Sequence, residues 1–130
     1  MKVFSRSIVV SLLLFAFSGC ADPCDKNAHE CRDLGYEYLN KYNDSNNIED
    51  ALTAHEYLKK GCEGGVARDC KDIGYIYMIG SRGAIRNYEE AQKYLTRGCD
   101  LYNEDACGYL DEVIKKMDSI KEMRKRQDKK

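Results

Sequence analysis

The sequence predicts an all-α fold, a short α/α solenoid of helix-turn-helix repeats, and three observations support this prediction. The pair Gly61-Cys62 recurs 37 residues later as Gly98-Cys99, and Cys70 recurs with the same offset as Cys107. A period between about 20 and 50 residues is typical of repeat arrays. The recurring residues are mostly glycine, cysteine, alanine, tyrosine and leucine, which pack helices together. Within each unit the apolar positions fall on one helical face.

The first helix of each unit carries a Leu-Gly-x-x-Tyr motif or a close variant of it. Leu34-Gly35-Tyr36-Glu37-Tyr38 is matched 39 residues later by Ile73-Gly74-Tyr75-Ile76-Tyr77. We expect the first of these helices to begin near Asn27. A glycine inside a helix costs about 1 kcal/mol relative to alanine. The recurrence of Gly35 and Gly74 therefore indicates that a neighbouring helix approaches closely at these positions.

The second helix of each unit follows a polar turn. These turns are expected at 43–47 and 80–83, and the helices after them at 49–60 and 87–97. Asp50 and Asn87 lie at equivalent positions near the helix starts, and both are predicted N-caps.

The last unit departs from the motif, because Asp111 stands where the other units have glycine, although Val113 and Ile114 continue an apolar face. Terminal repeats commonly differ in this way because they cap the stack. Residues 20–130 are therefore expected to form one domain. It comprises a first repeat at about 27–62, a second at about 66–99 and a capping helix at about 103–123.

Residues 1–19 have the features of an export signal. Lys2 and Arg6 flank the start of an apolar run, Ile8 to Phe17, that is about half the length of a membrane-spanning helix. The segment Phe17-Ser18-Gly19-Cys20 resembles a bacterial lipobox, after which Cys20 becomes the acylated N-terminus. We expect an exported lipoprotein on the periplasmic side or the outer membrane. An ordinary secretory signal with a cysteine nearby by chance is the alternative.

The chain has seven cysteines, and acylation of Cys20 leaves six, which can pair completely. A short chain that has crossed a membrane lies where disulfides persist. Zinc ligands usually come as closely spaced cysteine or histidine pairs, whereas here the cysteines lie seven or eight residues apart with only His29 and His55 to help. We therefore expect disulfides, with no metal and no cofactor.

Charge is distributed unevenly along the chain. Between Cys20 and Ile114 there are 11 Lys+Arg against 19 Asp+Glu, whereas residues 115–130 carry 8 against 3. We interpret the basic tail as a solvated helix face, and attraction to an anionic surface is the alternative. Nothing in the pattern suggests nucleic-acid binding.

The repeated motifs, together with Gly83-Ala84, Asn87 and the cysteine pairs, resemble the Sel-one-like repeat (SLR) family. The resemblance is to its cysteine-rich secreted bacterial branch, the Hcp-like proteins, and covers about residues 24–110. It implies a TPR-like right-handed superhelix in which disulfides join the end of one repeat to the start of the next. The implied bridges are Cys62–Cys70 and Cys99–Cys107, with Cys24 and Cys31 as the third pair.

Hcp-like proteins often carry a β-lactamase label, so the resemblance also implies that hydrolysis must be considered. A serine β-lactamase needs Ser-x-x-Lys, and Ser45, Ser81 and Ser119 are followed three residues later by Ile, Ala and Glu. His29 and His55 are expected to be solvated surface histidines. A weak β-lactam-binding protein or β-lactamase therefore stays the alternative function.

The preferred function is binding of a protein or peptide partner in the cell envelope by the concave face of the solenoid. One side of the first-of-pair helices, about 140° from the packing stripe, mixes aromatic, amide and carboxylate groups and contains no nucleophile–base pair. The acidic repeat body favours a partner of basic character. The candidate binding residues are Asp33, Tyr36, Asn40, Asp72, Tyr75 and Ile79.

Overall fold

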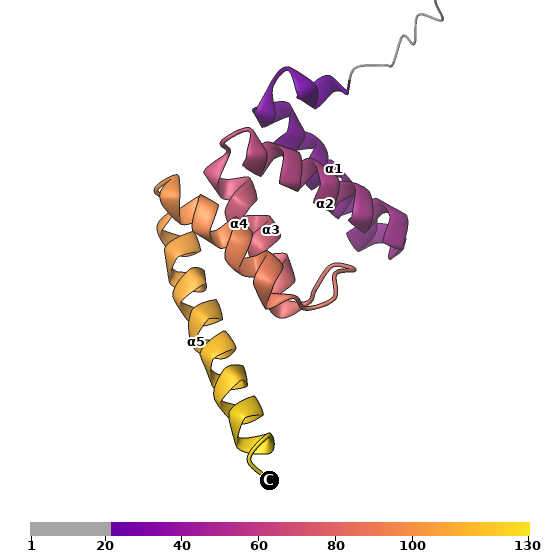
Figure 1. The fold of residues 1–130 in the computed structure, drawn as a ribbon. Helices are drawn as coiled ribbons and strands as arrows, with labels where there is room; N and C mark the ends of the chain where they lie inside the picture. The colour runs from indigo at the N-terminus through magenta and orange to yellow at the C-terminus, as the bar shows by residue number, and fades with distance from the viewer. Residues whose placement is uncertain (1–21) are drawn as a thin grey trace, which may run out of the picture.

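The computed structural model describes residues 22–130, so the predicted signal peptide and Cys20 lie outside the described residues. Five α-helices follow a short 3-10 turn, η1 (Pro23–Asp25). They are α1 (Ala28–Ser45), α2 (Ile48–Glu63), α3 (Ala67–Ile79), α4 (Tyr88–Asp100) and α5 (Glu104–Gln127). Consecutive helices pack against one another, which gives two helix pairs and a final single helix (Figure 1). The predicted all-α repeat fold is therefore confirmed.

Asparagine caps four of the five α-helices. The side chains of Asn27, Asn47, Asn87 and Asn103 each accept a hydrogen bond from a backbone N–H in the first turn of the helix that follows. Each cap satisfies one of the amide groups that a helix start leaves unpaired. The prediction for Asn87 is thus confirmed.

The predicted N-cap at Asp50 is wrong. Helix α1 continues to Ser45, and the turn is only Asn46 and Asn47, so α2 begins earlier in its repeat than α4 does in its own. Asn46 adopts the left-handed conformation, with φ of 54°, which allows so short a turn. Asp50 therefore lies in the first turn of α2, where its negative charge interacts favourably with the positive end of the helix dipole.

The recurring glycines lie where the two helices of a pair come closest. A Cβ atom on Gly35 would lie 3.0 Å from Leu58 Cδ2, and one on Gly74 would lie 2.6 Å from Leu95 Cγ. Both leucines are fully buried. The close helix approach expected from the sequence is confirmed, and both pairs use the same glycine–leucine contact.

Three disulfides join the elements end to end. Cys24–Cys31 links η1 to α1, Cys62–Cys70 links the end of α2 to the start of α3, and Cys99–Cys107 links α4 to α5. The bonds follow the pairing that the resemblance implies. They indicate an oxidising compartment. In the described part of the chain, no helix combines the length and apolarity needed to cross a membrane.

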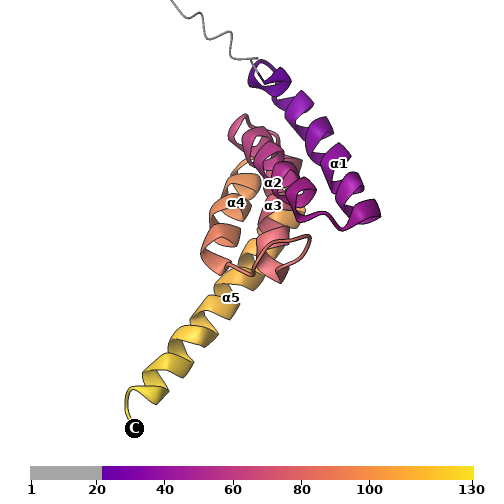
Figure 2. The same cartoon turned by 90° about the vertical axis from the view of Figure 1, so that its right-hand side faces the viewer.

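Helix α5 is longer than its neighbours and extends past them. It begins beside the end of α4, runs back along that helix and projects from the body, so that η1 and the end of α5 lie at opposite ends of the molecule (Figures 1 and 2). Val113 is buried, whereas residues from Ile114 onward are largely exposed. The helix expected at about 103–123 begins at Glu104 and continues to Gln127.

Asp69 is a buried carboxyl group that the sequence pattern did not reveal. It is fully buried, and neither of its carboxylate oxygens has a hydrogen-bond partner in the described structure. The carboxyl group fills the space beside Gly61, where a Cβ atom would lie 1.8 Å from Oδ2. One repeat later the equivalent contact is between Gly98 and Ala106. Asp69 thus occupies a position that an alanine fills in the next repeat.

Burial, assisted by the nearby Asp72 carboxylate, raises the pKa of Asp69 to about 7, while Arg32 and Arg68 act in the opposite direction. The ordinary pKa of an unfolded aspartate is about 3.9. Between these values the folded chain binds more protons than the unfolded chain. The free energy of unfolding should therefore fall as the pH rises from about 4 to about 7, because ionising this group inside the protein is unfavourable.

We predict that Asp69→Ala raises the free energy of unfolding by about 1–3 kcal/mol at pH 8, because it removes an unpaired buried carboxylate. At pH 4.5 the difference should be much smaller. Urea denaturation at both pH values measures the effect. Ala106→Asp is the reciprocal variant and should destabilise the protein more at pH 8 than at pH 4.5. A loss of stability in Asp69→Ala at pH 8 would contradict this explanation.

Candidate functional site

Four of the six candidate binding residues meet in one pocket. Tyr36 from α1 and Asp72, Tyr75 and Ile79 from α3 line a hollow of about 410 Å³, which we call the repeat pocket. Ile76, Arg68 and the turn residues Ser81 and Arg82 complete its lining. Two successive repeats are therefore needed to build the pocket.

Tyr36 connects the two repeats. Its hydroxyl donates a hydrogen bond to the carboxylate of Asp72, and the Arg68 guanidinium lies 5.4 Å from the centre of its ring. Asp72 also pairs with Lys71 at 2.8 Å and lies 3.9 Å from Arg68. Burial first, and then the hydrogen bond to Asp72, raise the pKa of the Tyr36 hydroxyl well above its ordinary value. Tyr36 therefore stays protonated at neutral pH and acts as a donor.

The next repeat makes the equivalent contact with a different residue. Tyr75 corresponds to Tyr36, and Tyr109 on α5 lies 37 residues after Asp72. The rings of Tyr75 and Tyr109 lie 4.9 Å apart, centre to centre. In both repeats, therefore, a tyrosine of the first helix contacts the equivalent position of the next first-of-pair helix. Tyr36 contacts Asp72, and Tyr75 contacts Tyr109. Here an aromatic pair replaces the hydrogen bond.

The other two candidate residues lie outside this lining. Asp33 is exposed and pairs with the adjacent Arg32 at 2.9 Å. Asn40 is exposed one turn beyond Tyr36 on α1. Both lie on the outward side of α1, as the helical projection indicated, but the structure does not bring them into the pocket.

The repeat pattern does not identify the basic residues of the pocket. Arg68 precedes Asp72 by one helical turn, a spacing that favours ion pairs and could have been recognised. The sequence identifies Ser81 and Arg82 only as turn residues. Their position depends on how the loop after α3 folds back, with Arg82 itself in the left-handed conformation at φ of 49°. Sequence spacing contains no signal for that path.

The repeat pocket is suited to contact rather than to hydrolysis. Tyr75 and Ile79 are each 37% exposed and offer apolar surface, while Arg68 and Arg82 offer guanidinium groups. Ser81 is the only aliphatic hydroxyl among the lining residues, and neither histidine nor lysine lines the pocket with it. Activation of a serine needs a general base within hydrogen-bond reach, and the Asp72 and Tyr36 side chains of the lining are already hydrogen-bonded to each other. The β-lactamase alternative therefore has no support in this pocket.

The two histidines differ in their surroundings. His29 is exposed, as expected. The expectation for His55 is wrong, because its side chain is only 3% exposed and its Nε2 atom has no hydrogen-bond partner in the described structure. The ring lines a hollow together with Tyr77 and the Gly83–Asn87 part of the loop after α3. Burial lowers the pKa of His55, so the ring is neutral at neutral pH.

One group of potential metal ligands occurs in residues 22–130, at Asp22, Cys24 and Asp25. The Cys24 sulfur is already bonded to Cys31, and a thiolate is the form that binds metal. Both aspartates pair with Lys60, at 2.6 and 3.5 Å. These contacts fasten η1 to α2 and leave no suitable ligand set.

The sequence is distantly similar to two curated proteins. It is 26% identical over 96 residues to cytochrome c oxidase assembly factor 7 of Xenopus tropicalis and 25% identical over 96 residues to cytochrome c oxidase assembly factor 7A of Xenopus laevis. Each alignment covers 73% of this chain and 41% of the relative. The chain therefore spans less than half the length of these relatives. No family model matches the sequence, and no solved structure matches it.

We predict that Tyr36→Phe lowers the free energy of unfolding by about 1–3 kcal/mol, because it leaves the Asp72 carboxylate without its partly buried donor. Urea denaturation at neutral pH measures this change. Tyr102→Phe is the matched control, since that side chain is 94% exposed, and it should leave stability unchanged. Equal stability of the Tyr36→Phe variant and the parent protein would show that the inter-repeat hydrogen bond contributes nothing.

Proposed function

We propose that this protein is a helical-repeat scaffold of the bacterial cell envelope that binds a segment of a partner protein in the repeat pocket. The observation that carries the proposal is the pocket itself. It is built from two repeats and presents Tyr75 and Ile79 beside the guanidinium groups of Arg68 and Arg82. Aromatic and arginine side chains of this kind dominate the energetics of protein interfaces.

The architecture supports a scaffold role. Stacked repeats hold an extended surface in a fixed shape, and the disulfides further restrict this short array. The distant relatives are named as assembly factors for cytochrome c oxidase. That name supports a role in handling other proteins.

The pocket differs in charge from the body around it. Asp72 is engaged by Tyr36, Lys71 and Arg68, so its carboxylate is already neutralised within the protein. The remaining lining offers apolar surface and arginine. An apolar side chain next to a carboxylate or a backbone carbonyl is the chemistry that fits this pocket best.

Export and acylation at Cys20 complete the proposal, and the three disulfides, which indicate an oxidising compartment, support export. We predict that Cys20→Ala abolishes membrane association, because the acyl chains would be the attachment. Fractionation of cells that express the variant, followed by detergent phase separation, measures the distribution. If the variant fractionates with membranes as the parent protein does, Cys20 is not the anchor.

For the binding site, we predict that Ile79→Asp abolishes capture of the envelope partner, because it places a charge on the apolar wall of the repeat pocket. Ile114→Asp is the control, since Ile114 is 38% exposed on α5, outside the pocket. The measurement is quantitative mass spectrometry of proteins cross-linked to each variant in the envelope, with circular dichroism to verify the fold.

Capture that survives Ile79→Asp would remove the repeat pocket from the binding site. Equal loss in both variants would indicate a general effect of added charge. Turnover of a chromogenic cephalosporin by the purified protein, above a heat-inactivated control, would instead favour the hydrolase alternative.

A further inference from the structure

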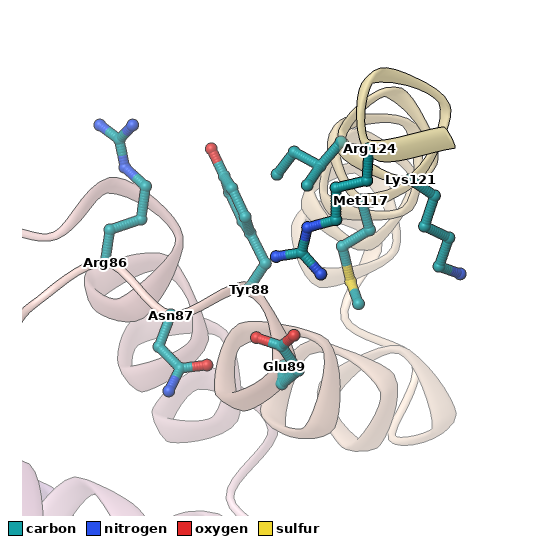
Figure 3. Close-up of a pocket in the computed structure, with 8 residues that line it drawn as sticks. Arg86, Asn87, Tyr88, Glu89, Met117, Lys121 and Arg124 are labelled. Carbon is teal, nitrogen blue, oxygen red and sulfur yellow. The ribbon is translucent and has the colours of Figure 1, made fainter. Parts of the chain in front are cut away.

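A second hollow, separate from the repeat pocket, lies between the start of α4 and the projecting part of α5. Its volume is about 350 Å³. We call it the α4–α5 groove, and the residues that matter here are Arg86, Tyr88, Glu89, Met117, Ile120 and Arg124. Figure 3 shows the Tyr88 ring standing between the Arg86 segment and α5, with the Arg124 guanidinium turned toward the ring and the Met117 side chain directed toward α4.

The groove exists because α5 is longer than the helix it packs on. Helix α4 has 13 residues and α5 has 24, so α5 passes the start of α4 and continues alone (Figures 1 and 2). Met117 and Ile120 lie where α5 passes this end of α4, and both are only partly buried. In residues 22–130 no later helix covers them. The groove therefore offers apolar surface between two rigid helices.

Two arginines on opposite walls make the groove cationic. Within the described part of the chain, neither Arg86 nor Arg124 forms an ion pair with a carboxylate. Arg86 donates only a long hydrogen bond, 3.4 Å, to the carbonyl of Ile79. Glu89 is the single carboxylate in the lining. The groove thus lies beside the basic tail of a chain whose repeat body is acidic.

A smaller hollow of about 200 Å³ neighbours both the groove and the repeat pocket. It shares Ile79 with the repeat pocket and both Arg86 and Tyr88 with the groove. Three neighbouring hollows therefore lie near the end of α3 and the start of α4. An extended chain fits a row of hollows better than a compact ion does.

We propose that the α4–α5 groove binds an acidic segment of a protein partner. An apolar side chain of that segment packs on Tyr88, Met117 and Ile120, and neighbouring carboxylates accept hydrogen bonds from Arg86 and Arg124. The planar guanidinium group matches a carboxylate in geometry and charge. This inference rests on the proposed function in taking the ligand to be a protein segment and in placing the membrane anchor at Cys20.

An anionic membrane is the competing ligand for a basic helix, and the geometry disfavours it. Met117 and Arg124 are directed toward α4 and not away from the body (Figure 3). In addition, η1 and the end of α5 lie at opposite ends of the molecule (Figures 1 and 2). A membrane held at the N-terminal end would therefore be remote from the groove.

The test is fluorescence anisotropy of the full mature protein with a short labelled peptide of glutamate and leucine, and with its glutamine–leucine counterpart. The glutamate peptide should bind, and the glutamine peptide should bind about tenfold more weakly because the charge-assisted hydrogen bonds are lost. Arg86→Glu/Arg124→Glu should weaken binding of the glutamate peptide by about tenfold or more. Arg126→Glu/Lys129→Glu makes the same charge change on exposed residues outside the groove and should change the affinity by less than about twofold.

Three results would overturn the inference. The first is absence of measurable binding of the glutamate peptide; Arg124-dependent binding of phosphatidylglycerol vesicles, or of a second copy of the chain in sedimentation, would then identify the ligand that takes its place. The second is equal binding of both peptides. The third is equal weakening by the groove variant and its control, which would show unspecific attraction.

Ile79→Asp separates this inference from the proposed function. Weakening by the groove variant, with or without an effect of Ile79→Asp, supports the groove. Weakening by Ile79→Asp alone would overturn the groove as the acidic-segment site and leave the repeat pocket as the proposed binding site.

Discussion

The glycine–leucine contact within each helix pair is the constraint on which the rest of the structure depends. Gly35 and Gly74 allow the backbone of the first helix to approach Leu58 and Leu95 of the second to distances that a Cβ atom would not permit. Each such contact costs helix propensity and recovers it through burial of a leucine, which contributes about 1.5–3 kcal/mol. Close pairing also fixes where each second helix ends, and therefore where the disulfide to the next helix can form.

Once the pairs are fixed, the inter-repeat contacts follow from the stacking. Tyr36 of α1 and Tyr75 of α3 occupy equivalent positions. Each contacts the equivalent residue of the next first-of-pair helix, which is Asp72 for Tyr36 and Tyr109 for Tyr75. The scaffold requires only that these residues touch. It does not determine whether the contact is a hydrogen bond or an aromatic pair, so the chemistry of the pocket can change while the fold stays the same.

Because the scaffold recurs and the chemistry of the pocket does not, the fold was more predictable from the sequence than the site. Periodicity identifies what recurs, which here includes the helices, the glycine contacts and the cysteine spacing, and the helical projection placed Tyr36 and Tyr75 on one side. Asp69 and His55 are departures from the repeat, so the repeat pattern does not predict that they are buried. Asp69 lies against Gly61, and His55 lines a hollow with a loop that folds over α2. Arg82 enters the pocket through the same loop, whose path is a tertiary property.

Helix α5 departs from the other first-of-pair helices at the position of the packing glycine. Asp111 occupies the position that glycine holds in α1 and α3, and it is exposed. A leucine from a further helix would meet a charged side chain there, since the glycine–leucine contact cannot form without a glycine. Helix α5 therefore lacks the contact that pairs the other first helices, and its remaining apolar residues face either α4 or solvent. With Asp111 in place of the packing glycine, this face of α5 is accessible in the described residues, beside a tail whose charge is opposite to that of the repeats.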